Sequence, residues 1–195
     1  MARPRTFDED AVVAAARDQF WNGGYAATSV DDLSVATGLG KGSLYGCFGD
    51  KHSLFMRALD DYSAHAMDRV VAQLRRPGVA AHDRLAGHVR AMVADIVADA
   101  ERRGCMMAKS SAEFGATDAD VDRVVSQSLT RWRDALVECI AEAQRDGTVS
   151  AAADPDALAT MLLGLIRGFE TLRTGGVEPS RIATAAEAAL AMLAA

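Results

Sequence analysis

Residues 28–51 have the sequence TSVDDLSVATGLGKGSLYGCFGDK, which predicts two short helices joined by a tight turn. Thr28 or Ser29 can cap the first helix, because each is followed three residues later by an aspartate, the spacing of a capping box. Gly38 can adopt the left-handed conformation that ends many helices. The pattern predicts a helix-turn-helix, whose second helix suits the major groove of DNA.

The second helix of this motif is expected to span residues 41–48 and to have two different faces. Its inner face carries apolar residues at helical spacing, namely Leu44, Cys47 and Phe48. Its outer face carries Lys41, Gly42, Ser43, Tyr45 and Gly46. A glycine inside a helix costs about 1 kcal/mol relative to alanine. We interpret Gly42 as a position where the helix backbone approaches DNA closely, and leave the reason for Gly46 open.

The run Gly38-Leu39-Gly40-Lys41-Gly42-Ser43-Leu44-Tyr45, followed by Phe48, Lys51 and Leu54-Phe55, is similar to a known signature. With these motifs, residues 8–60 resemble the DNA-binding domain of the TetR/AcrR family of bacterial repressors. Many members have an aromatic residue and a histidine where this chain has Gly46 and Cys47. DNA contacts at those two positions are therefore not carried over.

The resemblance implies a regulator that inserts its second motif helix into an inverted-repeat DNA operator as a homodimer. It also implies that Lys51 and the start of the next helix hold a DNA phosphate. Arginines of the N-terminal arm can reach a neighbouring groove. The expected DNA-contacting residues are Arg3, Arg5, Thr28, Ser29, Lys41, Gly42, Ser43, Leu44, Tyr45 and Lys51.

Composition favours helices throughout the chain. Half of the 195 residues are hydrophobic, 6% are aromatic and four are proline, and no stretch shows the alternation of a β-strand. We expect an all-α fold of nine helices, with a three-helix DNA-binding head and a larger helical body for effector binding and dimerisation. The expected division is residues 1–50 with the arm and head, and residues 51–195 with the body.

The charge pattern fits binding at specific DNA sites. The net charge of −6 argues against a protein that coats nucleic acid indiscriminately. Residues 33–49 nevertheless contain one lysine and no acid. No run approaches the ~20 apolar residues of a membrane span, and residues 1–4 begin no signal peptide. We expect a cytoplasmic protein without membrane contact, associated with the nucleoid when bound to its operator.

The helices of the body carry methionines and aromatic residues that can line a pocket for an apolar small-molecule effector. The same residues at helical spacing would also form an ordinary core. Arg167 differs, because a cation in an apolar run needs a carboxylate partner, solvent or an anionic ligand. The candidate pocket residues are Met92, Ile96, Cys105, Met106, Phe114, Trp132, Arg167 and Phe169.

The last two helices, expected at about residues 154–175 and 179–195, have broad apolar faces that would be sticky if exposed. The resemblance implies that they pair with their symmetry mates in a four-helix bundle; alternatively, they fold back on their own subunit. The candidate interface residues are Leu158, Met161, Leu165, Phe169, Ala185, Ala189 and Met192.

Three cysteines, Cys47, Cys105 and Cys139, are far apart and lack the spacing of a zinc site, and we expect no metal or cofactor. Cys105 follows Arg102-Arg103-Gly104 and starts a helix, two features that lower the pKa of a thiol. Similar stretches occur in family members that sense electrophiles or oxidants. The alternative is a small residue packed at a helix start.

The sequence thus predicts a ligand-responsive regulator, most simply a repressor released by an unidentified small molecule. Two alternatives stay open: a repressor that senses oxidants or electrophiles through Cys105, and a DNA-binding dimer without an effector. An enzyme is disfavoured, because the chain has no H-E-x-x-H motif, no nucleophile elbow and no locally spaced carboxylate pair.

Overall fold

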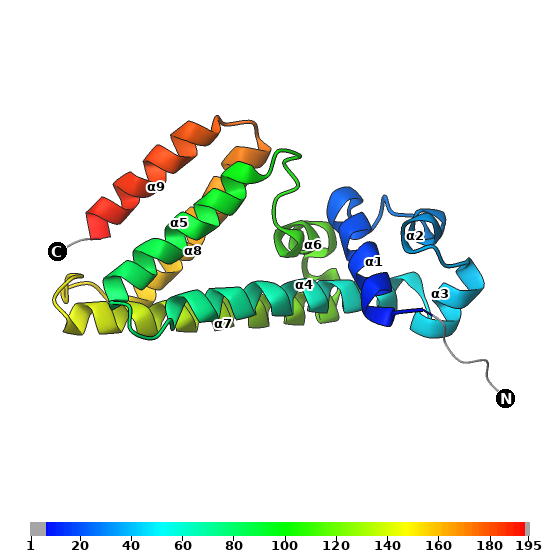
Figure 1. The fold of residues 1–195 in the computed structure, drawn as a ribbon, viewed down its shortest axis with the longest axis horizontal. Coiled ribbons are helices and arrows are strands. Elements are labelled where there is room, and N and C mark those ends of the chain that lie inside the picture. The colour runs from blue at the N-terminus through cyan, green and yellow to red at the C-terminus, as the bar shows by residue number, and fades with distance from the viewer. Residues whose placement is uncertain (1–6, 194–195) are drawn as a thin grey trace. The chain divides into compact units, whose positions relative to one another are not determined.

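The computed structural model describes residues 7–193, which form α-helices and no β-sheet (Figure 1). The prediction of an all-α protein with nine helices is confirmed for this part of the chain. The helices are α1 (Glu9–Gly23), α2 (Val30–Thr37), α3 (Lys41–Phe48), α4 (Lys51–Leu74), α5 (Ala81–Ala98), α6 (Met106–Phe114), α7 (Ala119–Arg145), α8 (Pro155–Thr174) and α9 (Pro179–Leu193). A 3-10 turn, Gly115–Thr117, follows α6.

The helices belong to two compact units. The first comprises residues up to 65 together with 105–125, and the second comprises residues 66–104 together with those from 126 onward. The boundary falls inside α4 and inside α7, so each of these helices contributes to both units. The functional division expected after residue 50 remains a prediction.

The first unit is built around a cluster of aromatic rings. The ring of Phe55 on α4 lies 5.2 Å from that of Phe20 on α1, 5.0 Å from that of Tyr25 and 5.3 Å from that of Phe114 on α6. Phe20 and Phe55 are each 2% exposed. Such contacts contribute more than their buried area alone, and here they join α1, α4 and α6.

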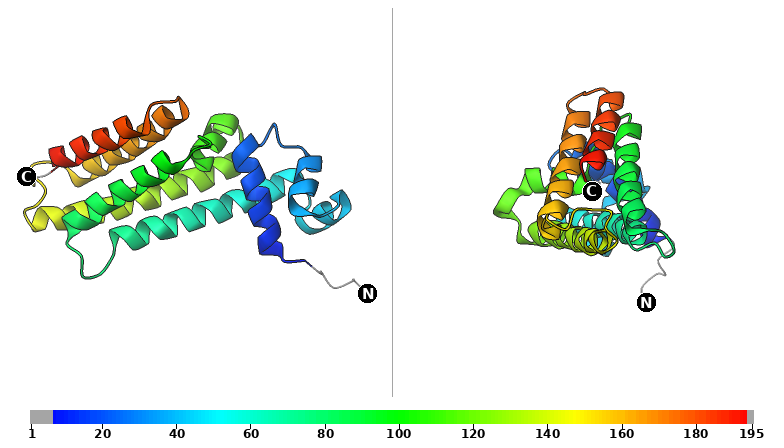
Figure 2. Two further views of the ribbon diagram at one scale, coloured as in Figure 1. Left: turned by 45° about the horizontal axis from the view of Figure 1, so that its top comes forward. Right: turned by 90° about the vertical axis from the view of Figure 1, so that its left-hand side faces the viewer.

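In the second unit, α5 packs against both α8 and α9, which also contact each other (Figures 1 and 2). Asp154 caps α8 by accepting from the N–H groups of Asp156 and Ala157, and Pro155 occupies the first helical turn, as the sequence indicated. The apolar stripes of α7 and α8 turn Trp132, Leu136, Leu162 and Ile166 inward, where none is exposed. No helix among residues 7–193 combines the length and apolarity needed to cross a membrane.

A buried polar chain runs through this second core. The indole N–H of Trp132 donates to Nε2 of His88 over 2.9 Å, and Nδ1 of His88 lies 2.7 Å from Oε1 of Gln73. Because Nε2 accepts, the imidazole carries its proton on Nδ1 and donates it to Gln73. Burial lowers the pKa of His88 from 6.5 to about 4, so the ring is neutral in the folded protein at neutral pH.

The end of α5 is the largest difference from the expected helix bounds. The sequence pattern predicted a helix over residues 80–102, but α5 ends at Ala98. Asp99 already leaves the helical conformation with a ψ angle of 83°, and Arg102 and Gly104, with φ angles of 55° and 68°, keep the following backbone out of a right-handed helix. The N–H of Gly104 instead donates to the Asp99 carboxylate over 2.8 Å. The helices expected over residues 41–48 and about 154–175 agree with α3 and α8 to within one residue at each end.

His88 predicts a component of acid destabilisation. Between pH 6.5 and 4 the unfolded chain takes up a proton that the folded protein does not. The free energy of unfolding therefore decreases as the pH is lowered, by about 3 kcal/mol over this window. In His88→Gln this component is absent. Urea unfolding across the window should therefore give a shallower pH dependence for the variant, although it is less stable than the wild type at neutral pH. Equal pH dependence would contradict the burial of a neutral imidazole.

Candidate nucleic-acid interface

The start of α2 is fixed by Ser29. The N–H of Asp32 donates to Oγ of Ser29 over 3.1 Å, and the N–H of Ser29 donates to the Asp32 carboxylate over 2.8 Å. This capping box holds the pKa of Asp32 below its ordinary value, mainly through the Ser29 hydroxyl. Thr28, the other candidate cap, is 1% exposed, and its hydroxyl donates to the carbonyl of Gly24. Ser29 therefore caps α2, whereas Thr28 fixes the preceding turn.

The turn and α3 have the geometry that the sequence indicated. Gly38 adopts a left-handed conformation with φ of 70°, which ends α2. Leu44 and Phe48 are buried at 3% and 8% exposure, so they anchor α3 to its unit. Leu44 is thus on the inner face, although it stands among the predicted DNA contacts. The exposed residues of α3 are Lys41, Gly42, Ser43, Tyr45 and Gly46.

The exposed face of α3 has no side chains at Gly42 and Gly46, and the space around both positions is open. A Cβ placed on Gly42 or Gly46 meets no atom within 4 Å, so neither residue is required by packing inside the subunit. Tyr45 lies beside them and is 47% exposed. An uncrowded glycine that weakens its helix fits a backbone that must approach another molecule.

One lysine begins α3 and another begins α4. Nζ of Lys41 lies 2.7 Å from Oδ1 of Asp31, and this carboxylate raises the pKa of Lys41. Both side chains are exposed, so water screens the pair and leaves it easy to break. Nζ of Lys51 lies 4.1 Å from the ring centroid of Tyr25, at the start of α4. Lys51 is therefore held at the helix N-terminus where a phosphate contact was predicted. Arg3 and Arg5 lie outside the described residues.

Side chains of α6 form hydrogen bonds with the backbone at the end of α1 and in the segment after it, a feature that the sequence analysis did not predict. The N–H groups of Tyr25 and Ala26 both donate to the Glu113 carboxylate, the first over 2.8 Å. Nζ of Lys109, one turn earlier on α6, donates to the carbonyl of Trp21 over 2.8 Å. Glu113 is 88 residues from Tyr25, so no local pattern announces the contact. These bonds fix the backbone that leads into α2.

The predicted effector residues are divided between the two units. Cys105, Met106 and Phe114 belong to the first, and Met92, Ile96, Trp132, Arg167 and Phe169 belong to the second. Nη1 of Arg167 lies 2.8 Å from the Glu170 carboxylate, and its guanidinium stacks 4.8 Å from the Trp132 ring centroid. Of the partners weighed for Arg167, a carboxylate is therefore present. Burial raises the pKa of Glu170, and Arg167 opposes this shift.

Cys105 precedes the first turn of α6 and is 6% exposed. Its sulfur lies 3.8 Å from the hydroxyl of Tyr62. Cys139 is also buried, and burial raises its pKa above the ordinary value. No group of three or more potential metal ligands occurs among the described residues.

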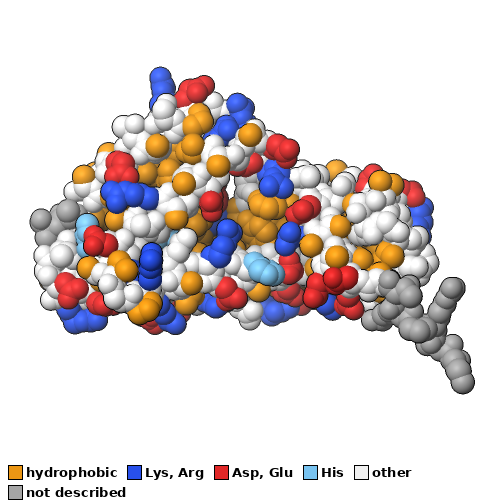
Figure 3. Space-filling view, viewed as in Figure 1, with side chains coloured by type: hydrophobic (Ala, Val, Ile, Leu, Met, Phe, Trp, Pro, Cys, Tyr) orange, Lys and Arg blue, Asp and Glu red, His pale blue; other side chains and the backbone are white. Residues whose placement is uncertain are grey.

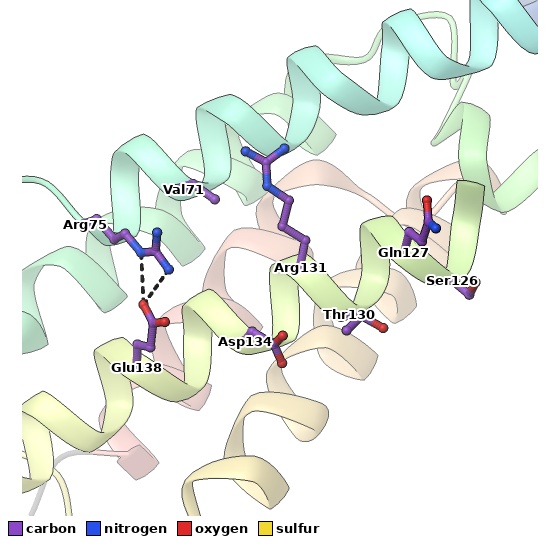
Figure 4. Close-up of a pocket in the computed structure, with 8 residues that line it drawn as sticks. All are labelled: Val71, Arg75, Ser126, Gln127, Thr130, Arg131, Asp134 and Glu138. Atoms are coloured by element: carbon purple, nitrogen blue, oxygen red, sulfur yellow. Dashed lines mark hydrogen bonds and ion pairs between the residues drawn. The ribbon is translucent and has the colours of Figure 1, made fainter. Parts of the chain in front are cut away.

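A groove that the sequence did not suggest lies between α4 and α7, with a volume of about 470 Å³ (Figure 4). None of the predicted pocket residues lines it. Seven of its eight lining residues have polar side chains, and Nη2 of Arg75 lies 2.7 Å from the Glu138 carboxylate in an ion pair. Its lining residues are Val71, Arg75, Ser126, Gln127, Thr130, Arg131, Asp134 and Glu138.

The predicted interface residues differ in exposure. Met161 and Met192 are 51% and 86% exposed, and Ala185 is exposed as well. Leu158, Leu165 and Ala189 are half-buried, whereas Phe169 is only 3% exposed and packs inside the subunit. Across the face shown in Figure 3, acidic and basic side chains alternate rather than forming one large field of either sign.

Comparisons with known proteins agree with this geometry. A profile described as bacterial regulatory proteins of the tetR family matches residues 12–58, and one described as a tetracyclin repressor-like C-terminal domain matches residues 81–189. The HTH-type transcriptional repressor ComR of Escherichia coli (strain K12) is 28% identical over 167 residues, which cover 86% of this chain and 80% of ComR. The transcriptional regulator AcuR of Cereibacter sphaeroides is 28% identical over 152 residues, covering 76% of this chain and 68% of AcuR.

A solved relative extends the comparison to a DNA complex. A cysteine mutant of the TetR family transcriptional regulator CifR, complexed with 26-bp double-strand operator DNA, matches with a TM-score of 0.79 and 27% identity. The alignment covers 98% of this chain and 100% of the CifR chain. The similarity therefore includes the helix-turn-helix and the body.

Gly42 on α3 and Gly87 on α5, both with open space around the Cβ position, give a matched test of the α3 face. Gly42→Ala and Gly87→Ala each place a methyl group in open space and should stabilise their helices by up to about 1 kcal/mol. Only Gly42→Ala should weaken operator binding, by roughly tenfold, because its methyl group holds the α3 backbone away from DNA. Thermal unfolding and gel-shift titration measure the two effects. Equal operator affinity in both variants would contradict close approach at Gly42.

Proposed function

Because the chain belongs to the TetR family of DNA-binding transcriptional repressors, we propose that it binds an inverted-repeat operator as a homodimer and is released by a small-molecule effector. The observation that carries the DNA-binding part is the exposed, glycine-smoothed face of α3, on a helix anchored by Leu44 and Phe48. A helix displayed in this way fits the major groove. The family assignment agrees with the resemblance seen in residues 38–55.

Each exposed residue of the motif has a distinct role in this proposal. Lys41, Ser43 and Tyr45 contact base edges or the DNA backbone, and Gly42 permits close approach. Lys41 exchanges its screened pair with Asp31 for a phosphate or base. Ser29 and Lys51 hold phosphates at the N-termini of α2 and α4. Thr28 acts on the operator through the turn that it fixes.

The proposed dimer forms through α8 and α9. Support comes from the exposed apolar face of α8, where Met161 and Leu172 are 51% and 47% exposed, and from Met192 on α9. Gly164 and Gly168 lie on the exposed side of α8 with nothing near their Cβ positions, so a partner helix can approach closely. Dimerisation removes these apolar surfaces from water.

For effector release, we place the ligand in the second unit among Met92, Ile96, Trp132, Arg167 and Phe169. The stacked Arg167–Trp132 pair offers polar and aromatic contacts to a ligand that otherwise meets apolar side chains. Helix α4 contributes to both units, so a ligand that shifts it changes the spacing of the two heads. The DNA-bound and DNA-free states differ in the spacing of the two heads. A ligand that binds the DNA-free state more tightly lowers operator affinity by the difference in its binding free energy to the two states.

A second candidate function is release by modification of Cys105. Cys105 is the residue before α6, the helix that carries Lys109 and Glu113. An adduct at this buried site would therefore disturb the hydrogen bonds from α6 to Trp21 and Tyr25. N-ethylmaleimide should then abolish the operator gel shift of the wild type and leave Cys105→Ser bound. A shift that alkylation does not change in the wild type would contradict thiol sensing and leave the non-covalent effector as the account.

The proposal includes no catalytic step, since the family is one of transcription regulators. We also propose a cytoplasmic protein that associates with the nucleoid when bound to its operator.

Tyr45 provides the direct test of the proposed α3 contacts. Tyr45→Ala should abolish specific binding in a gel shift with DNA from upstream of the protein's own gene, or with DNA selected from a random pool. Sedimentation should show that its homodimer persists, because Tyr45 belongs to the first unit and the proposed interface helices belong to the second. Tyr45→Phe keeps the ring and should retain part of the affinity. A normal footprint from Tyr45→Ala would contradict the assignment of α3.

A further inference from the structure

The second unit contains buried arginines that differ in their partners. Arg84 is 9% exposed in its side chain and contacts the Glu142 carboxylate, and its Nη1 donates to the carbonyl of Leu74. Arg167 has the Glu170 carboxylate and the Trp132 ring. Arg173 on α8 is likewise 9% exposed, yet its side chain has no hydrogen bond or ion pair to any described residue. The Nε atoms of all three arginines are buried without an acceptor, so Arg173 differs from the other two by having no carboxylate partner among the described residues.

An unpaired guanidinium is costly to bury, because it loses water without gaining an opposite charge. A cation near the C-terminus of a helix is favourable, but it is favourable at the surface too, so the helix dipole does not explain the burial. The carbonyls at this helix end are already occupied. Those of Thr171, Leu172 and Arg173 accept from the N–H groups of residues 175, 177 and 176.

A second arginine lies at the same end of α8. A Cβ on Gly176 would lie 3.1 Å from Nη1 of Arg102, so the guanidinium of Arg102 rests against the α8–α9 turn. The N–H of Gly176 donates to the backbone carbonyl of Arg173, so the backbone of Arg173 adjoins the turn that the guanidinium of Arg102 contacts. The side chain of Arg102 also has no hydrogen bond or ion pair to a described residue, and its φ of 55° is left-handed. The Asp99 carboxylate is engaged by the N–H of Gly104.

We propose that Arg173 and Arg102 form a binding site for a small anionic group, a carboxylate or a phosphate, at the end of α8. The inference rests on the proposed ligand-responsive function, and it gives the effector an anionic group. Arg173 supplies a guanidinium that is nine-tenths buried and has no carboxylate partner among the described residues, so water screens its attraction to an anion only weakly. Exposed Arg102, from the connection between α5 and α6, places its guanidinium against Gly176 of the α8–α9 turn, three residues after Arg173.

A partner subunit is a poorer match for this charge. Arg173 follows Ile166 and Phe169 along the buried face of α8, and those residues are 0% and 3% exposed. The exposed face of α8 carries Met161 and Leu172 instead. A second copy docked on that face would meet the methionine and the leucine, whereas a small anion can reach a guanidinium between packed helices.

The test compares two buried arginines by thermal unfolding of the DNA-free protein. Arg173→Met removes an unpaired charge, so we expect its Tm to rise by about 2–4 °C. The matched control Arg84→Met removes a paired charge and should lower the Tm, because Glu142 loses its partner. A purely structural role would make both substitutions destabilising. A lower Tm in Arg173→Met would therefore contradict the proposal.

Anion binding is measured on the same proteins with sodium phosphate and sodium acetate, each compared with sodium chloride at equal ionic strength. At least one of the two should raise the Tm of the wild type and of Arg84→Met, with a size that grows with its concentration. Phosphate acting alone or acetate acting alone identifies the anionic group. Neither should act on Arg173→Met. Protection of Arg173→Met, or no protection of the wild type by either anion, would overturn the site.

Arg102→Gly gives a second variant that relieves the left-handed backbone instead of straining it. It should keep the wild-type Tm or exceed it while weakening the response to the anion. An unchanged response would contradict the two-arginine site. A gel shift on the wild-type protein separates the two proposals, because failure to bind any operator contradicts the regulatory function and leaves the anion measurements standing.

Discussion

The burial of α2 and α3 against a small aromatic core is the constraint on which the DNA-binding unit depends. Each of these helices has eight residues, which is too short for an isolated helix to persist in water. Leu33, Leu44 and Phe48 turn inward, and the rings around Phe55 join α1, α4 and α6 in the same unit. The capping box at Ser29 and the left-handed Gly38 set where α2 starts and stops. Tertiary packing therefore supplies the stability that the two helices lack.

The same packing explains how α3 can carry residues that weaken it. Gly42 and Gly46 lower helix propensity, and α3 has no side-chain cap at its N-terminus. Because Leu44 and Phe48 anchor the helix, the residues of its outer face are not needed for packing and can be suited to DNA binding. Helix α6 adds a second restraint through Glu113 and Lys109, which hold backbone groups just before α2. The head is thus rigid because of contacts from a helix far along the chain.

Local sequence signals predicted the features that depend on local chemistry. The aspartate three residues after Ser29 predicted the cap, and Gly38 predicted the end of α2. The inner and outer faces of α3 also followed from helical spacing. The signals were ambiguous where two residues offered the same chemistry, as with Thr28 and Ser29, and packing decided between them because Thr28 is buried.

Features that depend on distant contacts could not be predicted in this way. No pattern near Tyr25 indicates that Glu113 accepts its N–H. The sequence pattern singled out Arg167, whereas Arg173 is the arginine of α8 that is buried without a carboxylate partner among the described residues. Both arginines lie on α8, and only the packing of that helix separates their surroundings. The early end of α5 likewise depends on the non-helical conformation of Asp99 and the residues after it, which helical periodicity does not reveal.

The central claim is that α3 enters the major groove at two symmetric half-sites. Dimethyl sulfate modifies guanine N7, which lies in the major groove, so methylation protection on DNA selected from a random pool tests the claim directly. We expect protected guanines in two inverted half-sites, separated by about one helical turn or a multiple of it. Protection confined to the minor groove, or a single asymmetric site, would contradict it.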